Sequence, residues 1–461
     1  MLYYLTWFLP LLAVGAVVAT GRISLRYLAM LALWLTLLSP CLTRIMTWLA
    51  AVPVGEVITF TALGNALVTG TFGLMVLLSL GQGKLVSLIS NSIDYIVIIY
   101  IIWGLLFVIY PNQSFLEGIW GFKNNIVPIM WYFLARLLVK GHMDLRRLLV
   151  GIGVFLIFNN LYAIFQKLYG LVLPFDLYYY TTTAARLIKL HGERVYISGF
   201  LTGIEGWYVI SIIGILCFGL RRALRLPIGL SLSLWTSLIA LFLIHPERTP
   251  FVMIVIGIVT FLFLVSLKRP VRAVTLLLAV IFTAGILYTA REKIAFQLTH
   301  LGGQYAYFAG LFTPETDVSF QIRRNMNWSQ ALRLLRDNPF GIGMGKLCSD
   351  YASRFGTEWI GPHNYFLQVA LGYSLLGLIL FVMLIAGLIK QDLSLALQSD
   401  DPALRALGAT RVGITLAMLA ASFVVLPFAG ISGSCYWLVM GLRLWPSKPS
   451  RISLGEEAVT W

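Results

Sequence analysis

The stretch YIVIIYIIWGLLFVIY, residues 95–110, contains no charged residue and is closed by Pro111. A helix needs about 20 mostly apolar residues to cross a bilayer, and fewer when anchoring side chains flank it. Apolar runs of comparable length recur near residues 2–20, 27–43, 58–81, 94–110, 124–140, 148–173, 200–219, 228–245, 251–267, 273–289, 364–389, 411–428 and 430–445. The last run is the weakest, because it contains Arg443. The sequence therefore predicts an all-α polytopic membrane protein with about 12 or 13 transmembrane helices.

Composition excludes an ordinary soluble protein. The 461 residues are 59% hydrophobic and only 11% charged, and their mean hydropathy is +0.86. Soluble globular chains carry about 25% charged residues. Apolar runs continue from end to end, so we expect a single transmembrane domain over residues 1–461.

Lys and Arg are distributed unevenly between the loops. One alternating set of loops is rich in them and carries Arg22, Arg26, Lys84, Lys140, Arg146, Arg147, Arg221, Arg222, Arg225, Lys268, Arg269, Arg272, Lys390, Arg405 and Arg411. The other short loops hold little positive charge beyond Arg44, Lys123 and Arg248. The positive-inside rule makes the first set cytoplasmic, so the polar segments 174–199 and 290–363 are expected outside. The net charge of +15 then reflects topology and does not indicate a nucleic-acid partner.

The longer outer segment contains a helical pattern. In RRNMNWSQALRLLRD, which begins at Arg323, the apolar residues Trp328, Leu332 and Leu335 recur at helical spacing, and the glycines of GIGMG follow. We expect an amphipathic helix at the outer membrane surface. A helix N-terminus disfavours cations, so Arg323 and Arg324 require an anionic partner: a protein carboxylate, a lipid phosphate or a substrate.

Three arginines that could bind an anion, and one histidine that could act as a base, lie on the outer side near the ends of transmembrane helices. Arg248 lies in HPERTP, Arg194 in HGERVY and His363 in GPHNYF, while Arg324 opens the surface helix. Each arginine alone has an ordinary explanation, since interfacial arginines reach lipid phosphate and Glu247 can share the charge of Arg248. As a set, the guanidinium groups match the oxygens of a pyrophosphate, and the histidine can take a proton from an attacking hydroxyl.

Metal and cofactor chemistry find little support in the sequence. There is no DxD or HExxH spacing, the ExD at residues 315–317 is isolated, and the four cysteines form no CxxC. We therefore expect no metal and no cofactor. Arginine would then supply the charge neutralisation that Mg²⁺ supplies in other phosphate sites.

Two polar clusters have structural interpretations beside functional ones. Tyr178, Tyr179 and Tyr180 suit a sugar site, but they also suit an interfacial aromatic belt, which is the simpler interpretation. Asn159 and Asn160 stand within an apolar run, where amides more often join helices than bind ligands.

The stretch RRNMNWSQALRLLRDNPFGIGMG, followed by GPHNYFLQVALGYSLLGLILF, resembles the segment shared by O-antigen ligases and Wzy-type polysaccharide polymerases. In that family an Arg stands four residues before a Trp, and an Asp-x-Pro-x-x-Gly-x-Gly element follows. Arg324 and Trp328 match this spacing, and residues 337–343 resemble the element with one residue fewer between Pro339 and the first glycine. A His-Asn pair then opens a glycine-containing span, and His363 and Asn364 match it, with Leu367, Gly372 and Gly377 further along.

Two upstream matches are shorter. HPERTPFVMIVIG resembles the family's small turn that carries an Arg before a span, although Glu247 replaces the usual serine and leaves Arg248 as the matched position. ERVYISGF resembles an Arg-x-x-Gly-x-Phe-type segment, with Arg194 aligned, although TGIEGW follows where Pro-Asn is common. The detailed resemblance covers about residues 190–390.

The resemblance implies a GT-C-like, metal-independent, inverting glycosyltransferase whose donor is a glycan on undecaprenyl diphosphate. The residues that it implies for diphosphate binding are Arg248, Arg324, Arg194 and Arg323. His363 would activate the acceptor hydroxyl while undecaprenyl diphosphate leaves, and Asn364 and Trp328 would support the site.

The same resemblance implies a multi-pass protein of the bacterial inner (plasma) membrane, with its active site facing the periplasm. Its partners would be the lipid bilayer, the lipid-linked donor, a glycan or lipid A–core acceptor, and a chain-length regulator protein, with no nucleic acid.

Several activities stay open at this stage. A polymerase joins repeat chains, a ligase transfers the chain to lipid A–core, and a protein transferase glycosylates Ser or Thr. Two sizeable outer segments favour the polymerase, and the sequence shows no appended C-terminal domain of the kind that would favour the protein transferase. A lipid-glycan flippase or other transporter is the rival from another class. It should carry ionisable groups near the bilayer midplane and internal repeats, whereas here the notable charges cluster at outer span ends.

Overall fold

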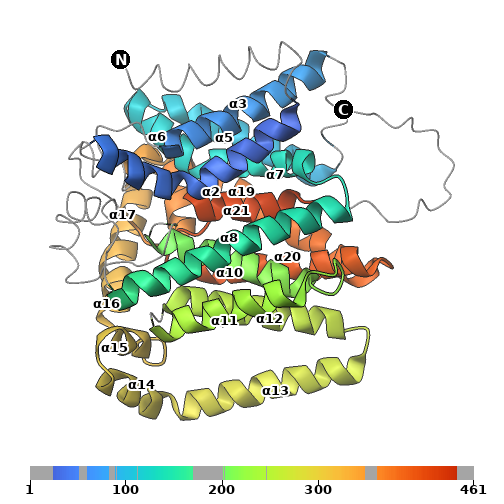
Figure 1. Cartoon of the computed structure of the whole chain (residues 1–461). Coiled ribbons are helices and arrows are strands. Elements are labelled where there is room, and N and C mark those ends of the chain that lie inside the picture. Colours follow the sequence, from blue (N-terminus) through green and yellow to red (C-terminus); the bar gives the residue numbers. More distant parts are fainter. Residues whose placement is uncertain are drawn as a thin grey trace.

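The computed structural model describes residues 24–50, 60–81, 89, 91–111, 113–169, 201, 203–244, 247–347 and 361–443. Every regular element within these residues is a helix (Figure 1). The helices are α2 (Leu25–Ala50), α3 (Phe60–Gly81), α5 (Ser92–Leu106), η1 (Phe107–Ile109), α6 (Phe115–Asn125), α7 (Val127–Leu138), α8 (His142–Tyr169), α10 (Gly203–Leu220), α11 (Ile228–Ile244), α12 (Arg248–Ser266), α13 (Pro270–Thr289), α14 (Arg291–His300), α15 (Gly303–Ala309), α16 (Val318–Ile322), η2 (Arg323–Trp328), α17 (Ser329–Asp337), η3 (Gly345–Leu347), α19 (Tyr365–Gln398), α20 (Pro402–Ser422) and α21 (Gly430–Gly441).

The predicted all-α polytopic membrane architecture is confirmed. Eight helices are long and apolar enough to cross a membrane, and α7, α10 and α11 are shorter apolar helices. Each apolar run predicted beyond residue 24 coincides with one of these helices or with α21. The run at 2–20 and the outer segment 174–199 lie outside the described residues.

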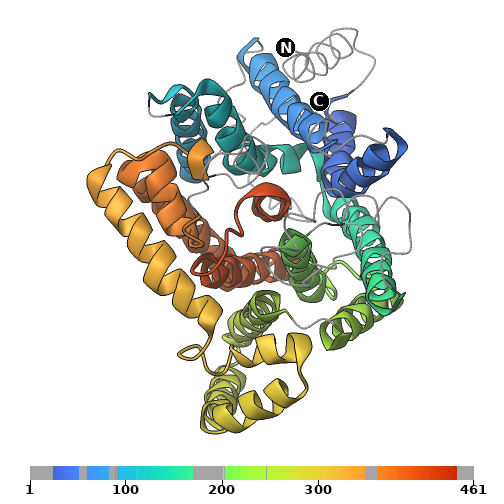
Figure 2. The same ribbon diagram turned by 90° about the vertical axis from the view of Figure 1, so that its left-hand side faces the viewer.

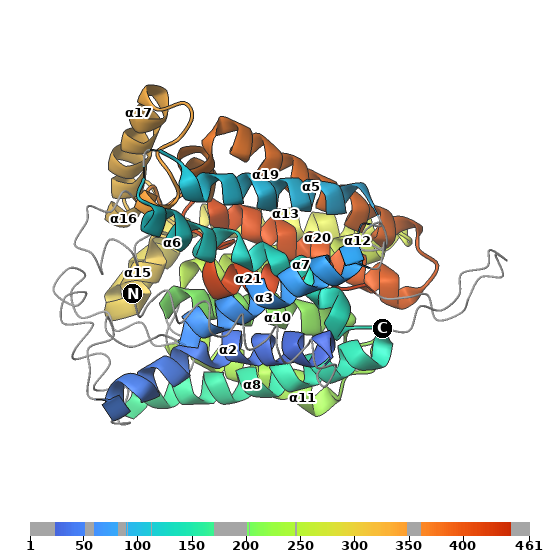
Figure 3. The ribbon, with the colours of Figure 1, turned by 90° about the horizontal axis from the view of Figure 1, so that it is seen from above.

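The run predicted at 124–140 is only the second part of a longer two-helix element. α6 and α7 meet at Ile126, and Pro128 stands in the first turn of α7, where its missing N–H is tolerated. A capping box starts α6: the Ser114 hydroxyl accepts the Glu117 N–H at 3.2 Å, and the Glu117 carboxylate accepts the Ser114 N–H at 2.6 Å. Together the two helices cross the bundle (Figure 3). Polar residues interrupt FLEGIWGFKNN, which is why apolar periodicity missed α6.

The long helices lie side by side, and consecutive ones run in opposite directions. Residues 290–347 cover one end of the bundle, here called the loop end (Figure 1). The turns at 221–227, between α12 and α13, and between α19 and α20 lie at the other end, here called the arginine-rich end (Figure 1). The alternation of loops that the Lys and Arg pattern predicted is therefore present in the fold. The assignment of the arginine-rich end to the cytoplasm stays a prediction.

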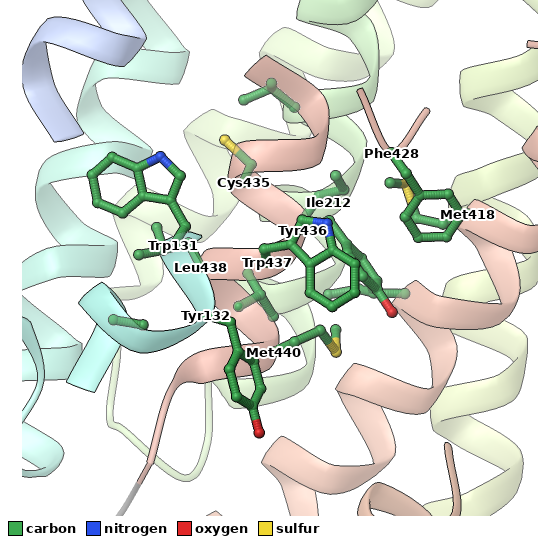
Figure 4. Close-up of a cluster of buried hydrophobic side chains, with 14 of the residues drawn as sticks. Trp131, Tyr132, Ile212, Met418, Phe428, Cys435, Tyr436, Trp437, Leu438 and Met440 are labelled. Atoms are coloured by element: carbon green, nitrogen blue, oxygen red, sulfur yellow. The ribbon is translucent and has the colours of Figure 1, made fainter. Parts of the chain in front are cut away.

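The short last helix, α21, lies at the centre of the bundle rather than at its rim (Figure 2). Its Tyr436 and Trp437 are fully buried, and Trp131 of α7 is buried beside them (Figure 4). Gly441 permits this packing, because a Cβ there would lie 2.0 Å from the Tyr132 carbonyl oxygen. The aromatic side chains fill the space between close-packed helices.

Buried ion pairs hold the arginine-rich end together. Asp94, fully buried at the start of α5, accepts hydrogen bonds from Tyr132 at 2.9 Å and Arg443 at 3.0 Å, and it pairs with Arg136 as well. Arg443 made the last predicted run the weakest, and its ion pair with Asp94 explains how a charge is accommodated there. A second buried pair joins α19 to α20. A buried charge is tolerated when it is paired and hydrogen-bonded in this way.

The two buried asparagines of α8 join structural elements, as predicted. The Asn160 amide donates to the Ser237 hydroxyl of α11 at 3.1 Å. The Asn159 side-chain oxygen accepts the Leu201 N–H at 3.0 Å. Both asparagines are fully buried, and each bond satisfies one of the two polar atoms of its amide.

Candidate active site

A continuous helical rod crosses the loop end of the bundle (Figure 2). It consists of α16, η2 and α17, residues 318–337, and is called the rod below. Its N-cap is Asp317, whose carboxylate accepts the Ser319 N–H at 3.3 Å. The predicted surface helix is confirmed, although it begins five residues earlier than RRNMNW suggested.

The Arg-x-x-x-Trp motif lies on a π-helical turn. Residues Arg323–Trp328 form i→i+5 hydrogen bonds, which widen the helix in the middle of the rod. Just beyond it, the Ser329 hydroxyl donates to the Asn325 carbonyl at 2.6 Å. π-Helical turns are rare and occur frequently at functional sites. Apolar periodicity predicted an ordinary α-helix here and missed the turn.

The face of the rod that contacts the bundle carries Ala331, Leu334 and Leu335. Of the apolar stripe seen in the sequence, Leu335 packs against the bundle, whereas Leu332 is 55% exposed.

The arginine pair of the turn has no carboxylate partner among the described residues. Arg324 is exposed and Arg323 is half-buried. Trp328 is anchored edge-on against Phe320, with 6.1 Å between ring centroids. The expectation that the two arginines open the helix was wrong, because the helix begins at Val318 and they lie within it.

Arg248 is the first residue of α12 and is held by the start of the rod. Its Nη1 lies 2.6 Å from Oδ2 of Asp317, and the two side chains are only 12% and 14% exposed. A cation at a helix N-terminus is unfavourable, and this carboxylate compensates it. Gly310 leaves room for the guanidinium, because a Cβ there would lie 2.5 Å from Nη1.

Asp317 is the residue of the candidate site that sequence reasoning missed. It belongs to the ExD at 315–317 that looked isolated, and no spacing in the chain connects it with Arg248. The one local signal was its place as an N-cap before a helix. Its contact with Arg248 is tertiary and required the fold.

His363 adopts a strained backbone conformation immediately before α19. Its φ is 48°, in the left-handed region that non-glycine residues rarely occupy. The next residue, Asn364, is the N-cap of α19, and its side-chain oxygen accepts the Leu367 N–H at 3.1 Å. Asn364 therefore fixes the start of the helix and, with it, the place of His363. Such strain persists where the surroundings impose it and is concentrated at active sites.

The glycine motif after the rod docks on a broken helix. α19 is interrupted at Ser374, whose φ is 72° and ψ 170°, so carbonyls near the break need new partners. The Ile342 N–H donates to the Leu371 carbonyl at 2.7 Å, and the Trp103 indole donates to the Tyr373 carbonyl at 2.9 Å. The GIGMG segment is therefore a structural anchor.

The rod is thus fixed at both ends, with the π-helical turn between. Asp317 anchors its start to Arg248, and Ile342 anchors the segment beyond its end to α19. From Asp317 to Arg323 the distance along the helix axis is about 9 Å. α17 contacts α19, the helix that His363 precedes. The loop end therefore carries Arg248, the two turn arginines and His363, whereas Arg194 lies outside the described residues.

The chemistry of this end suits an anionic ligand. Its candidate ligand groups are guanidinium groups, which form paired hydrogen bonds with phosphate oxygens. No group of three His, Cys, Asp or Glu side chains that could hold a metal occurs among the described residues.

Comparison with known proteins gives one family match. Residues 232–382 match a protein-family model described as O-antigen ligase. A search of curated proteins found no match. The matched residues include Arg248, the whole rod and His363, and they exclude Arg194. Over residues 232–382, about a third of its length, the chain is therefore similar to the O-antigen ligase family.

Proposed function

We propose that this protein polymerises glycan repeat units carried on undecaprenyl diphosphate, by an inverting transfer that needs no metal, at the periplasmic face of a bacterial inner membrane. The observation that carries the proposal is the clustering at the loop end. There, Arg248 is tied to the rod that bears Arg323 and Arg324, and α19 begins beside His363. The family match makes a membrane enzyme that acts on lipid-linked glycans the appropriate class.

The arginines bind the diphosphate of the donor. Arg324 is exposed, without a carboxylate partner among the described residues, and is available to an incoming phosphate. Arg248 exchanges the Asp317 carboxylate for a phosphate oxygen when the donor enters. Arg323 is the alternative ligand on the rod, and Arg194 is a further candidate. Negative charge grows on the diphosphate as its bond to the sugar breaks, so guanidinium groups placed there stabilise the transition state.

His363 is the base in this proposal. An acceptor hydroxyl oxygen attacks the anomeric carbon from the face opposite the diphosphate and forms the new C–O bond. The bond between the anomeric carbon and the diphosphate oxygen breaks, and its electron pair leaves with undecaprenyl diphosphate. The proton of the hydroxyl passes to His363, and configuration at the anomeric carbon inverts. Asn364 holds the helix start that places this histidine.

A ligase is the second candidate, because the matched family model is described as O-antigen ligase. It would use the same donor site and the same base with lipid A–core as the acceptor. Transport of a lipid-linked glycan is less favoured. The buried ion pairs of Asp94 and Asp392 join helices toward the arginine-rich end and do not form a path through the bundle.

The product of a reconstituted assay separates these functions. Purified full-length protein is given undecaprenyl-diphosphate-linked oligosaccharide, with or without lipid A–core, in the presence of EDTA. A ladder of longer glycans from donor alone supports the polymerase, and product only with lipid A–core identifies a ligase. Donor moved across proteoliposomes without any product would overturn the enzymatic proposal, and dependence on added divalent metal would overturn its metal-free mechanism.

A further inference from the structure

A cavity of about 330 Å³ lies between α10, α11 and α12, adjoining the turn at 221–227. This turn belongs to the arginine-rich end, remote from the candidate active site (Figure 1). The lining residues are Phe218, Arg221, Ile228, Ser231, Leu232, Trp235 and Ile258. The volume falls within the range of small-molecule sites, roughly 300 to 1,000 Å³.

One face of α11 supplies most of the wall. Ile228, Ser231, Leu232 and Trp235 follow the i, i+3, i+4, i+7 spacing of a single helical face. Ile228 is 69% exposed and Leu232 is 67% exposed, so this face borders the surface that the bilayer covers. Phe218 of α10 lies edge-on to Trp235, with 6.0 Å between ring centroids. A ligand that binds in this cavity must therefore be largely apolar.

A buried hydroxyl in this wall is unsatisfied. Ser231 is 6% exposed, and its Oγ has no hydrogen-bond partner among the described residues. Ser237, two turns further along the same helix, donates to the Leu234 carbonyl at 3.0 Å, as helical serines commonly do. A buried hydroxyl without a partner is unfavourable and calls for a partner from elsewhere. The ligand of this cavity should therefore carry a hydrogen-bond acceptor that reaches Ser231.

One arginine lines the cavity, and two more belong to the turn that adjoins it. Arg221 lines it, and Arg222 and Arg225 belong to the same turn; all three are exposed and none pairs with a described carboxylate. Leu224 and Leu226 are buried and anchor the turn beneath them. An occupant with an apolar chain should therefore carry an anionic head.

We propose that this cavity binds one anionic phospholipid of the leaflet at the arginine-rich end. Its phosphate lies on Arg221 and its neighbours, its ester carbonyl accepts the Ser231 hydroxyl, and one acyl chain follows the apolar face of α11 past Trp235. Membrane lipids reach the cavity from the side, because its wall continues into the bilayer-facing surface. A soluble anion would leave the apolar wall without a partner, and a neutral lipid would leave the arginines without one.

Quenching of Trp235 by brominated lipid tests this site. The full-length protein is reconstituted in phosphatidylcholine and titrated with phosphatidylglycerol brominated on its acyl chains. Because the chain has 13 tryptophans, the signal of Trp235 is taken as the difference from Trp235→Phe. We expect that signal to saturate with the anionic lipid and to respond little to brominated phosphatidylcholine. Equal quenching by both lipids overturns the proposal.

Two substitutions, at Arg221 and at Ser231, test the proposed polar contacts with the lipid. Arg221→Gln should weaken the apparent affinity about fivefold, whereas Arg272→Gln, in the first turn of α13 and outside the cavity, should leave it unchanged. Wild type should bind ester-linked phosphatidylglycerol about threefold better than the ether-linked form, and Ser231→Ala should remove that preference. Equal effects of the two arginine variants overturn the site, and an ether lipid that binds as well as the ester overturns the role of Ser231.

A competition experiment tests whether the bound lipid is a phospholipid. Undecaprenyl phosphate has the same combination of phosphate and apolar chain but no ester carbonyl. We expect it to displace the brominated phospholipid only in excess. Displacement at a tenth of the phospholipid concentration would overturn the assignment to phospholipid and identify an isoprenoid phosphate site.

Discussion

Arg248 at the start of α12 and Asp317 at the start of the rod form an ion pair, with 2.6 Å between Nη1 and Oδ2. The pair connects a membrane helix to the surface element that carries Arg323 and Arg324. Under the proposed function, the Asp317 carboxylate competes with a phosphate oxygen of the donor for Arg248, and the first two predictions depend on that competition.

Removing the charge of Asp317 should strengthen donor binding. Asp317→Asn keeps a good N-cap for the rod but no longer competes with phosphate for Arg248. We expect KM for the lipid-linked donor to fall about threefold to tenfold, with a smaller change in kcat. Glu315→Gln removes a neighbouring, more exposed charge and serves as the control. A higher KM in Asp317→Asn would mean that Asp317 holds Arg248 in its working position.

Adding a methyl group beside Arg248 should have the opposite effect. In Gly310→Ala the new Cβ would lie 2.5 Å from Arg248 Nη1, so the guanidinium must move. We expect KM for the donor to rise about tenfold while the melting temperature changes little, since a 1 Å displacement is enough to lose a well-placed contact. Gly285→Ala, where a Cβ meets nothing within 4 Å, should be neutral. Unchanged kinetics in Gly310→Ala would separate Arg248 from donor binding.

The two arginines of the π-helical turn should differ in importance. Arg324→Ala should lower kcat/KM by about 10²-fold to 10³-fold, the usual effect of removing one group that stabilises transition-state charge. Arg333→Ala, on α17 and also exposed, is the matched control and should retain activity. If Arg323→Ala abolishes transfer while Arg324→Ala does not, the half-buried Arg323 is the ligand. The arginine of the family motif then corresponds to Arg323 and not to Arg324.

The buried carboxylate of the arginine-rich end should contribute strongly to stability. Asp94→Ala leaves Arg136 and Arg443 without their shared partner, so we expect a loss of about 3–5 kcal/mol. The control is Asp144→Asn, because the Arg26 side chain that pairs with Asp144 is 41% exposed and such a pair contributes about 0–1 kcal/mol. Thermal unfolding in detergent measures both. Similar melting temperatures for the two variants would contradict a structural role for the Asp94 cluster.

The membrane fold was predictable because the bilayer imposes length and apolarity on each span. Runs such as residues 95–110 and 364–389 coincide with α5 and α19. The interruptions were not predictable. Ser374 stands within an apolar run with no proline, and it departs from helical geometry where the segment at Ile342 and the Trp103 indole satisfy the carbonyls.

The candidate site was predictable in its residue types and only partly in its geometry. The arginines, His363 and the surface helix all follow from charge pattern, spacing and resemblance. The π-helical turn was not predictable, because helical periodicity in a sequence does not reveal a change of hydrogen-bond register. Asp317 lies 69 residues from Arg248, and only tertiary packing brings the two together.

Transfer by His363→Gln tests the central claim most directly. In a single-turnover assay with undecaprenyl-diphosphate-linked oligosaccharide, wild type should extend the glycan, and His363→Gln should bind the donor with unchanged affinity but extend it about 10²-fold to 10⁴-fold more slowly. His300→Gln, an exposed histidine of α14 on the same loop end, is the matched control and should behave as wild type. Undiminished extension by His363→Gln would contradict the assignment of the base, and with it the proposed active site.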